Sequence, residues 1–468
     1  MRRAFQTHRR GLTALALIAV FASVHLLAQQ GRQGGRQSGG QGRGGTRPGG
    51  GVYLTDIPAH AIDVVLARPT TTSITVSVMA ATDMAATLTT EPAGASVALT
   101  LKAGVPFDAE LAKLTPNQQY RYTISGATPL ASGTFHTARP AGAPFVFNMQ
   151  ADSHLDGNSD ARVYTNTITN MLADTADFMV DLGDTFMTDK YPQYQDATKQ
   201  YIAQRYYFGL MGAGLPAFLT LGNHDGETAT RPDMTSWSAT MRKKYFPPVV
   251  TNSFYSAGPS ALDYSAWTWG DAQFIILDPF NDTRQKPRDD ADGWAWTLGK
   301  AQYDWLTKTL ESSKARYTFV FIHHLVGGST REGRGGAEAS VFFEWGGQNL
   351  DKTAGWAQHR SGWSMPIHDL LVRHHVTAVF HGHDHLYVRQ QRDGIVYLEV
   401  PQPSHARGDS TNTAQEYGYL TGTLLGSSGH VRVSVNRDGA TLEYVKSRLT
   451  GKNAEIVDRV VMTPAGGR

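Results

Sequence analysis

Short runs in which apolar and polar residues alternate fill residues 52–139. The runs are ITVSVMA at 74–80, ATLTT at 86–90, ASVALTL at 95–101, YRYTISG at 120–126 and GTFHTA at 133–138. Alternation with a period of two places apolar side chains on one face of a β-strand, and several such strands separated by turn residues are typical of an antiparallel β-sandwich. No cluster of catalytic residue types stands in this region, and His136 is not expected to bind a metal. The pattern therefore predicts an all-β domain over 52–139 without chemistry of its own.

A different rhythm begins after the short linker PAGAP at 140–144. Strand-like runs now alternate with helical patterns, which are YTNTITNMLA at 164–173, KAQYDWLTKTLESS at 300–313 and IHDLLVRH at 367–374. This alternation predicts an α/β domain over 143–468. Its last apolar runs flank an Arg-Asp-Gly turn and predict a β-hairpin over 431–445.

Histidine and aspartate gather in five short segments of this second region. They are DSH at 152–154, GDTF at 183–186, GNHD at 222–225, IHH at 322–324 and GHDH at 382–385. Each directly follows an apolar, strand-like run. Ligand-binding residues of an open α/β sheet collect at the carboxyl ends of its strands, so we expect the five segments to converge. Their N and O atoms are ligands that transition metals prefer, which predicts a two-metal phosphoesterase site.

The ordered set of segments resembles that of the calcineurin-like metallophosphoesterases, a superfamily that includes the purple acid phosphatases and the Ser/Thr protein phosphatases. The resemblance covers residues 143–468. In addition, LTPNQQYRYTI at 114–124 followed by GTFHT resembles the fibronectin type III domain that precedes the catalytic domain of purple acid phosphatases. The resemblance implies an α/β (α+β) metallophosphoesterase fold of two packed mixed β-sheets flanked by helices, preceded by a fibronectin III-like sandwich.

The resemblance also implies that seven residues bind two divalent or trivalent transition-metal ions. Asp152, His154 and His385 would hold the first ion, Asn223, His323 and His383 the second, and Asp184 would bridge them. A carboxylate suits the bridging position because it has two oxygens and a charge that offsets two close cations. His323 is preferred to His324 because the family ligand stands two residues before a proline, a position that Leu325 occupies here.

The resemblance implies that His224 is the catalytic residue near the leaving-group oxygen, as a proton donor or a positive charge. Many superfamily members orient this histidine with an Asp three residues after the bridging Asp, where this chain has Met187. The orienting partner is therefore missing or comes from elsewhere. Purple acid phosphatases place a Tyr ligand at the same position, and its bond to ferric iron gives their colour. Met187 therefore makes Mn, Zn or Fe(II) the expected ions, without an order among them.

The activity that the resemblance implies is hydrolysis of phosphate esters by a hydroxide shared between two metal ions. Monoesters, diesters and nucleotides all remain open as substrates, because superfamily members with the same ligands act on each of them. Phosphodiesterase or nucleotidase activity is therefore an alternative. An alternative of another class is an inactive, metal-containing protein that attaches to a surface through its sandwich.

A long insertion, residues 327–363, separates the IHH segment from the last predicted helix. Its candidate phosphate-binding residues are Arg331, Arg334, His359 and Arg360. Trp345 and Trp363 could flank an apolar leaving group. The alternative is a solvated loop with a few aromatic side chains packed on the core. Three further histidines near the motifs are expected to support the site or pack against it, and they are His324, His381 and His405.

The N-terminal 51 residues predict export. Residues 1–28 read as a signal peptide, in which arginines precede an apolar stretch that ends at the small residue Ala28. The Sec and twin-arginine routes both stay open, and an uncleaved anchor is the alternative to cleavage. After cleavage we expect no stable membrane insertion and a periplasmic or extracellular protein. Residues 29–51 are rich in Gly, Gln and Arg and predict a disordered linker.

Composition adds two restrictions. A net charge of +2 gives no reason to expect a nucleic-acid partner, so a small phosphate ester is the expected ligand. The chain has no cysteine, so it forms no disulfide and offers no thiolate to a metal. Any metal must therefore be held by His, Asn and carboxylates, and the oligomeric state stays open.

Overall fold

The computed structural model describes residues 53–92, 96–226, 231–258, 264–280, 282–283, 290–329 and 331–464. The predicted export signal and linker lie outside these residues. In the part of the chain that the structure describes, no helix is long and apolar enough to cross a membrane.

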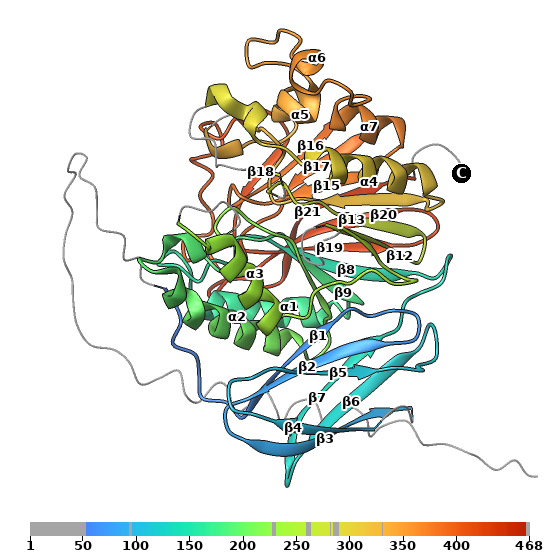
Figure 1. Ribbon diagram of the computed structural model, residues 1–468, viewed down its shortest axis with the longest axis vertical. Helices are drawn as coiled ribbons and strands as arrows, with labels where there is room; N and C mark the ends of the chain where they lie inside the picture. The colour runs from blue at the N-terminus through green and yellow to red at the C-terminus, as the bar shows by residue number, and fades with distance from the viewer. Residues whose placement is uncertain are drawn as a thin grey trace, which may run out of the picture. The chain divides into compact units, whose positions relative to one another are not determined.

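Strands β1 to β7 form two antiparallel sheets, coloured blue to cyan in Figure 1. One sheet has the strand order β1-β2-β5 and the other the order β4-β3-β6-β7. The strands are β1 (Ile62–Ala67), β2 (Ile74–Ala80), β3 (Met84–Glu91), β4 (Val97–Leu101), β5 (Phe107–Leu111), β6 (Gln119–Ser125) and β7 (Pro129–His136). Their apolar faces share one core, which confirms the predicted β-sandwich. That the sandwich is of the fibronectin type III kind stays a prediction.

Burial along β2 differs from the predicted alternation. Buried and exposed residues alternate along most of β3, whereas every residue of β2 is buried. The outer face of β1 and β2 packs against helix α2 (Thr198–Met211), where Arg205 donates to Asp63 Oδ1 at 2.6 Å and to the carbonyl oxygen of Ser77 at 2.9 Å. The sandwich is therefore joined to the following domain by a buried, polar contact that the alternating pattern does not reveal.

Two mixed β-sheets form the framework of residues 145–462. The first has the strand order β10-β9-β8-β19-β20-β21 and the second the order β11-β12-β13-β14-β15-β17-β16-β18. The first sheet contains β8 (Phe145–Gln150), β9 (Phe178–Asp181), β10 (Ala217–Leu219), β19 (Gly429–Val435), β20 (Ala440–Lys446) and β21 (Glu455–Met462). The second contains β11 (Ser256–Ala257), β12 (Ser265–Trp269), β13 (Ala272–Ile276), β14 (Tyr317–Phe321), β15 (Ala378–His381), β16 (Leu386–Arg392), β17 (Ile395–Glu399) and β18 (Thr423–Gly426). The pairing of β19 with β20 confirms the predicted hairpin.

Aromatic side chains fill the space between the two sheets. The ring centroid of Phe147 in β8 lies 5.0 Å from that of Phe274 in β13 and 5.3 Å from that of Phe319 in β14. These side chains belong to one buried cluster that draws on both sheets, so the sheets pack face to face as predicted.

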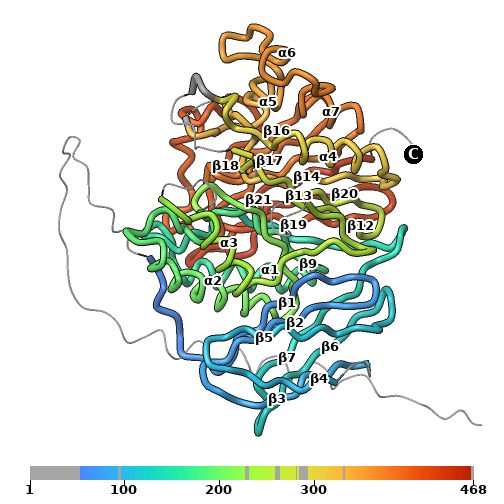
Figure 2. Tube along the Cα trace, viewed as in Figure 1, coloured from blue at the N-terminus to red at the C-terminus, as the bar shows by residue number. Residues whose placement is uncertain are grey.

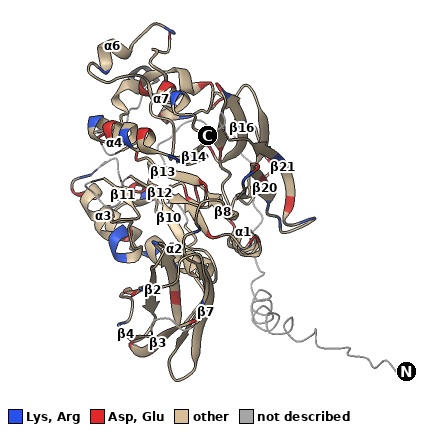
Figure 3. Cartoon of the chain, turned by 90° about the vertical axis from the view of Figure 1, so that its right-hand side faces the viewer, with Lys and Arg blue, Asp and Glu red and all other residues tan. Residues whose placement is uncertain are grey.

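Helices cover the outer faces of both sheets (Figures 1 and 2). Helices α1, α2 and α3 lie on the first sheet, and α4 and α7 lie on the second. Their bounds are α1 (Ala161–Ala173), α3 (Met234–Tyr245), α4 (Gly299–Ser312), α5 (Phe343–Gly346), α6 (Trp356–His359) and α7 (Ile367–Arg373). Short 3₁₀ turns are η1 (Thr188–Lys190), η2 (Tyr194–Ala197), η3 (Asp290–Ala295), η4 (Arg331–Gly333) and η5 (Ala339–Val341). Figure 3 shows acidic and basic residues on α4 and none on β13 or β14, as expected for a solvated helix over a buried sheet.

Candidate metal centre and active site

Every His- and Asp-rich segment begins within three residues of the end of a strand. DSH follows β8, GDTF follows β9, GNHD follows β10, IHH follows β14 and GHDH follows β15. Strands β8, β9 and β10 are parallel neighbours, and so are β14 and β15. The segments therefore come together at the carboxyl ends of these strands, where α/β sheets bind ligands.

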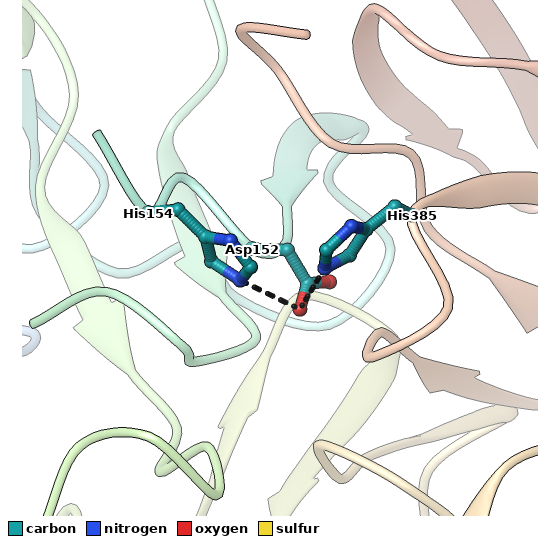
Figure 4. Close-up of side chains that lie close together, drawn as sticks. All are labelled: Asp152, His154 and His385. Carbon is teal, nitrogen blue, oxygen red and sulfur yellow. Dashed lines mark ion pairs between the residues drawn. The ribbon is translucent and has the colours of Figure 1, made fainter. Parts of the chain in front are cut away.

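A first cluster of candidate ligands surrounds the buried carboxylate of Asp152. Its Oδ1 lies 3.6 Å from His154 Nε2 and 3.5 Å from His385 Nε2. Figure 4 shows the two imidazoles approaching the carboxylate from opposite sides. The side chain of His385 is 34% exposed, whereas that of Asp152 is fully buried, so His385 forms the open side of the cluster.

A second cluster consists of Asp184, His323 and His383, whose candidate ligand atoms lie within 4.8 Å of one another. His323 Nε2 lies 3.3 Å from Asp184 Oδ2 and 3.0 Å from Asn223 Oδ1. The same Oδ2 of Asp184 lies 3.7 Å from His154 Nε2, which belongs to the first cluster. Asp184 thus stands between the clusters, in the place expected for a bridging carboxylate.

The spacing of these atoms fits shared metal ions better than hydrogen bonds. Separations of 3.3 to 3.7 Å are too long for good charge-assisted bonds. Two ligand atoms bound at about 2.1 Å to one tetrahedral ion lie about 3.4 Å apart. In the described residues, His154 Nε2 is buried without a hydrogen-bond partner. An imidazole nitrogen of this kind is a good ligand, so the residues present fit transition-metal ions that accept N and O donors.

The backbone is strained at most of the candidate ligands. Positive φ angles occur at Asp152 (57°), His154 (41°), Asp184 (55°), His383 (84°) and His385 (59°). A residue with a Cβ rarely adopts this left-handed conformation, and such strain concentrates at functional sites. The surrounding structure therefore holds these side chains where an unstrained loop would not place them.

Two motif glycines allow the strands to approach one another. A Cβ on Gly222 would overlap the backbone N and Oδ1 of Asp184, and one on Gly382 would lie 2.8 Å from Oδ2 of Asp152. The glycines of GNHD and GHDH are therefore required because neighbouring segments press against them.

Hydrogen bonds select which imidazole nitrogen faces the site. His323 Nδ1 donates to the carbonyl oxygen of Leu182 at 2.7 Å, so Nε2 faces Asp184 and Asn223. His383 Nε2 donates to the carbonyl oxygen of Glu332 at 2.9 Å, which leaves Nδ1 available as a ligand. Backbone carbonyls commonly orient metal-binding histidines in this way.

Comparisons with known proteins agree with this geometry. The family model described as calcineurin-like phosphoesterase matches residues 150–387, just over half of the chain. The chain belongs to this family. No curated protein matches it.

Solved structures give the same fold for this phosphoesterase. The chain is similar to the structure of PhoD, with 14% identity, a TM-score of 0.60 and coverage of 86% of this chain and 88% of that one. It is also similar to the purple acid phosphatase PPD1 from seeds of yellow lupin (Lupinus luteus), with 14% identity, a TM-score of 0.60 and coverage of 86% and 74%. At this identity the likeness shows the fold, while the family match identifies a metal-dependent phosphoric ester hydrolase.

A partner for His224 is present, although not at the position where relatives carry it. His224 Nδ1 lies 2.9 Å from Oδ1 and 3.0 Å from Oδ2 of Asp189. Met187 adopts φ 47° and starts the turn η1, which carries the acid two residues further along the chain. From the sequence the partner was either missing or elsewhere, and Asp189 was not identified because it stands two residues beyond the family position. His224 Nε2 lies 4.0 Å from Asp184 Oδ2, so its free edge faces the clusters.

Asp225, the last residue of GNHD, is a second residue that the sequence reasoning passed over. Its carboxylate accepts the backbone N–H groups of Asp184, Thr185 and Phe186 at 3.0, 2.9 and 2.8 Å. It also accepts the N–H of Gly222 at 2.8 Å. Asp225 thus links the GDTF loop to the GNHD loop. Its place in the GNHD motif was the sequence feature that could have identified it.

Charged groups within the site shift one another's pKa values. Burial opposes ionisation of Asp184, but His323 and His224 hold the pKa of its carboxyl well below the ordinary value. Burial also opposes the charged form of His323, yet Asp184 raises the pKa of this histidine to about 9. The buried carboxylates are therefore stabilised by nearby positive charge, which metal ions can supply.

Two candidate residues of the insertion at 327–363 make contacts within the protein. Arg360 donates to Glu344 and to the carbonyl oxygens of Trp294 and Trp296, so its guanidinium is engaged within the protein. His359 stacks on Trp294 with ring centroids 4.5 Å apart. The side chain of Arg331 lies outside the described residues. Substrate binding by these three residues stays a prediction.

The two tryptophans considered as leaving-group contacts differ in burial. Trp345 is fully buried and donates from Nε1 to the hydroxyl of Tyr397 at 3.0 Å, so it is a core residue, as in the alternative of aromatic side chains packed on the core. Trp363 is partly buried and packs against Tyr303 with ring centroids 4.5 Å apart. A contact between Trp363 and a leaving group stays a prediction.

The other histidines near the motifs make contacts of their own. The ring of His324 packs against Phe280 and Trp296. His381 Nδ1 lies 2.8 Å from Glu399 Oε2, and burial lowers the pKa of His381 to about 3. His405 Nδ1 accepts the N–H of Arg407 at 3.0 Å. The contacts of all three are the kind expected of supporting or packing residues.

Proposed function

We propose that the two clusters hold two transition-metal ions and that the site hydrolyses phosphate esters with His224 at the leaving group. The position of Asp184 carries the proposal, because one of its oxygens lies 3.3 Å from His323 Nε2 and 3.7 Å from His154 Nε2. A carboxylate between two sets of imidazoles is suited to bridge two cations. Ions bound there would supply Lewis acidity for the phosphoryl oxygens and an activated water.

The protein's own groups then divide the remaining work. Asp189 accepts from His224 Nδ1, which fixes the ring so that Nε2 points toward the reacting phosphate. His224 Nε2 would donate its proton to the leaving oxygen, where negative charge develops. The backbone N–H of His224 donates to Asp184 Oδ1 at 2.7 Å. This bond fixes the position of the proposed acid relative to the proposed bridging carboxylate.

The ligand set favours Mn, Zn or Fe(II). Met187 is buried and places a thioether where purple acid phosphatases carry a phenolate. The described ligand atoms are imidazole nitrogens and carboxylate or amide oxygens, which suit all three ions. We propose no order among them.

Elemental analysis of purified protein tests the binuclear centre. We expect about two equivalents of metal in the wild type and loss of both ions and of turnover in Asp184→Asn, since the bridging charge is gone. Metal below one equivalent that added Mn or Zn cannot restore would refute the proposal. A thermal unfolding curve for each protein separates metal loss from failure to fold.

A substrate panel tests the activity. Turnover of nitrophenyl phosphate, a bis-nitrophenyl diester and a nucleotide would distinguish a phosphomonoesterase from a phosphodiesterase or nucleotidase, which share the proposed site. A metal-loaded protein that hydrolyses none of these at any pH between 5 and 9 would favour the inactive, surface-binding alternative.

We further propose that the enzyme is exported. The proposal rests on the charged and apolar pattern of residues 1–28, followed by a Gly-rich linker. N-terminal sequencing of protein recovered outside the cytoplasm should begin after Ala28. Recovery of the intact N-terminus from the cytoplasm alone would refute export.

A further inference from the structure

One segment of the insertion does contact a candidate metal ligand. We call residues 331–339 the collar. The carbonyl oxygen of Glu332 accepts from His383 Nε2 at 2.9 Å. Arg334 Nη1 donates to the carbonyl oxygen of His383 at 2.9 Å and to Oδ1 of Asp384 at 2.7 Å. The collar therefore grips His383 at both its ring and its backbone.

The neighbouring residue completes the grip. Oδ2 of Asp384 accepts the N–H of Gly335 at 3.0 Å and the hydroxyl of Tyr419 at 2.6 Å. With Arg334 on Oδ1, the buried carboxylate of Asp384 is held from the collar on one side and from Tyr419 on the other. Because Asp384 separates His383 from His385 in the chain, this anchoring limits how the GHDH turn can move.

The collar is itself held in a strained shape. Positive φ angles occur at Glu332 (67°), Gly333 (80°) and Gly335 (108°). Glu332 has a Cβ, so its left-handed conformation is costly and needs support from its surroundings. That support comes from the far end of the collar, where Glu338 Oε1 accepts the N–H groups of Leu420 and Thr421 at 3.1 and 2.9 Å. The strained backbone aims the Glu332 carbonyl at His383.

The side chain of Arg334 is largely buried, which is unusual for an arginine in a loop that only connects surface elements. Its side chain is 15% exposed, and the guanidinium lies over the ring of Tyr417 at 4.3 Å. In the part of the chain that the structure describes, its Nε is buried without a hydrogen-bond partner. A buried hydrogen-bond donor without a partner is unfavourable. The guanidinium nevertheless leaves Nε unpaired, while its Nη1 donates to His383 and Asp384. Breaking a buried ion pair leaves an uncompensated charge, so this contact holds Arg334 and Asp384 together.

The first cluster is held by other segments. Ser427 Oγ donates to the carbonyl oxygen of His385 at 2.6 Å, and Gln200 donates to the carbonyl oxygen of His154. His154 Nδ1 lies 3.4 Å from Asp156 Oδ2. These anchors come from β18 and its following loop, from α2 and from the loop after β8. The first cluster thus has anchors outside the collar, although the GHDH turn carries ligands of both clusters and the N–H of His383 donates to Oδ2 of Asp152 at 2.8 Å.

We propose that Arg334 is a positioning residue for His383, and that the collar sets the affinity of the second metal ion more strongly than that of the first. The inference rests on the proposed binuclear centre. It adds a residue that positions one of the proposed metal ligands. Residues that orient metal-binding histidines typically change metal affinity about 10- to 100-fold when they are replaced. Loss of Arg334 removes the bonds to the His383 carbonyl and to Oδ1 of Asp384, so Nδ1 of His383 is held less firmly toward Asp184.

Titration of the metal-stripped full chain with Mn(II) tests the inference without using activity. Calorimetry and electron paramagnetic resonance report the affinity of each site and whether two Mn(II) ions are coupled. We expect two tight sites in the wild type. In Arg334→Met we expect one unchanged site and one weakened about 10- to 100-fold, with the signal of an isolated Mn(II) in place of the coupled pair. His323→Ala and His385→Ala serve as references for loss of the second and first sites.

Arg360→Met is the matched control. Arg360 belongs to the same insertion, is 11% exposed and pairs with the buried carboxylate of Glu344. It contacts no candidate metal ligand in the described residues, so both Mn(II) affinities should stay as in the wild type. Arg334→Lys keeps the buried charge beside Asp384 if the methionine variant fails to fold. An ammonium lacks the planar fork of guanidinium, so the second site should still weaken.

The outcomes separate this inference from the function on which it rests. A wild type that binds fewer than two Mn(II) ions counts against the binuclear centre itself. Two sites in the wild type that both persist unchanged in Arg334→Met and Arg334→Lys would overturn the role of Arg334. Equal weakening of both sites, or equal weakening in Arg334→Met and Arg360→Met, would overturn the selective effect of Arg334 on the second site.

Discussion

Replacing Asp189 with Asn should slow turnover in a way that depends on the leaving group. Asp189 and His224 are 10% and 14% exposed, and Nδ1 lies about equally far from both carboxylate oxygens. A hydrogen bond to a charged partner contributes about 1.5–3 kcal/mol. Since each 1.36 kcal/mol is tenfold in rate, kcat for an alkyl phosphate should fall about 10- to 150-fold. The loss should be much smaller for nitrophenyl phosphate, because nitrophenolate leaves without a proton.

The assay compares kcat for the two esters in Asp189→Asn, His224→Ala and the double variant at matched metal content. His224→Ala alone should lower the alkyl rate by about 10²–10⁴-fold, and adding Asp189→Asn should change little more, because Asp189 acts through His224. Asp196→Asn, an exposed residue in the neighbouring turn η2, is the matched control and should be neutral. Equal losses for both esters, or an undiminished effect of Asp189→Asn in the His224→Ala background, would refute the orienting role.

Three further predictions follow from other parts of the molecule. Arg205→Met should lower the free energy of unfolding by about 3–5 kcal/mol, because it strands the buried charge of Asp63, and Asp63→Leu in the same chain should recover part of the loss in denaturant titrations. Burial opposes the charged form of Asp458, but bonds from Arg389 and Tyr387 hold the pKa of its carboxyl below the ordinary value. That stabilisation is present above about pH 4 and is lost as the pH falls through the folded pKa. Asp458→Asn should therefore be less stable than the wild type at pH 7. The difference in stability should shrink below pH 4, and thermal unfolding measured at several pH values would show it. The metal-loaded enzyme should show no strong visible band, since Met187 replaces the ligand that gives purple enzymes their colour, and a ferric-phenolate band would contradict this.

The packing of the sandwich bears on deletion of the N-terminal region. Because residues 52–139 carry no cluster of catalytic residue types, deleting residues 29–139 should leave the catalytic motifs intact. The structure shows Leu54 donating to the carbonyl oxygen of Leu155 at 2.6 Å, beside the DSH segment, and Tyr53 stacked on Tyr191 at 4.6 Å. Truncation would remove these contacts. It would also expose the face of α2 that packs against the sandwich. Stability of the catalytic domain should therefore suffer, even though no catalytic residue is removed.

The order of motifs along the chain was sufficient to predict which residues gather at the site. This succeeded because the chemistry is local in sequence: each candidate ligand stands just beyond a strand, and parallel strands carry their ends to one edge. The helical runs at 164–173, 300–313 and 367–374 were equally readable, since their periodicity reflects burial on one face.

Other features depended on contacts between distant segments. Asp189 became the partner of His224 through the backbone conformation of Met187, and Arg334 reached His383 across 49 residues of chain. The sequence left two roles open for Trp345, a leaving-group contact or packing on the core, and the tertiary structure makes it a core residue. Such pairings depend on how loops pack against one another in the folded protein. Many side chains of suitable chemistry could occupy each position. Sequence alone thus determined the family, the layered fold and the candidate ligands, because they follow from local patterns. The tertiary structure alone decided which residues orient those ligands, because orientation depends on distances that local patterns do not encode.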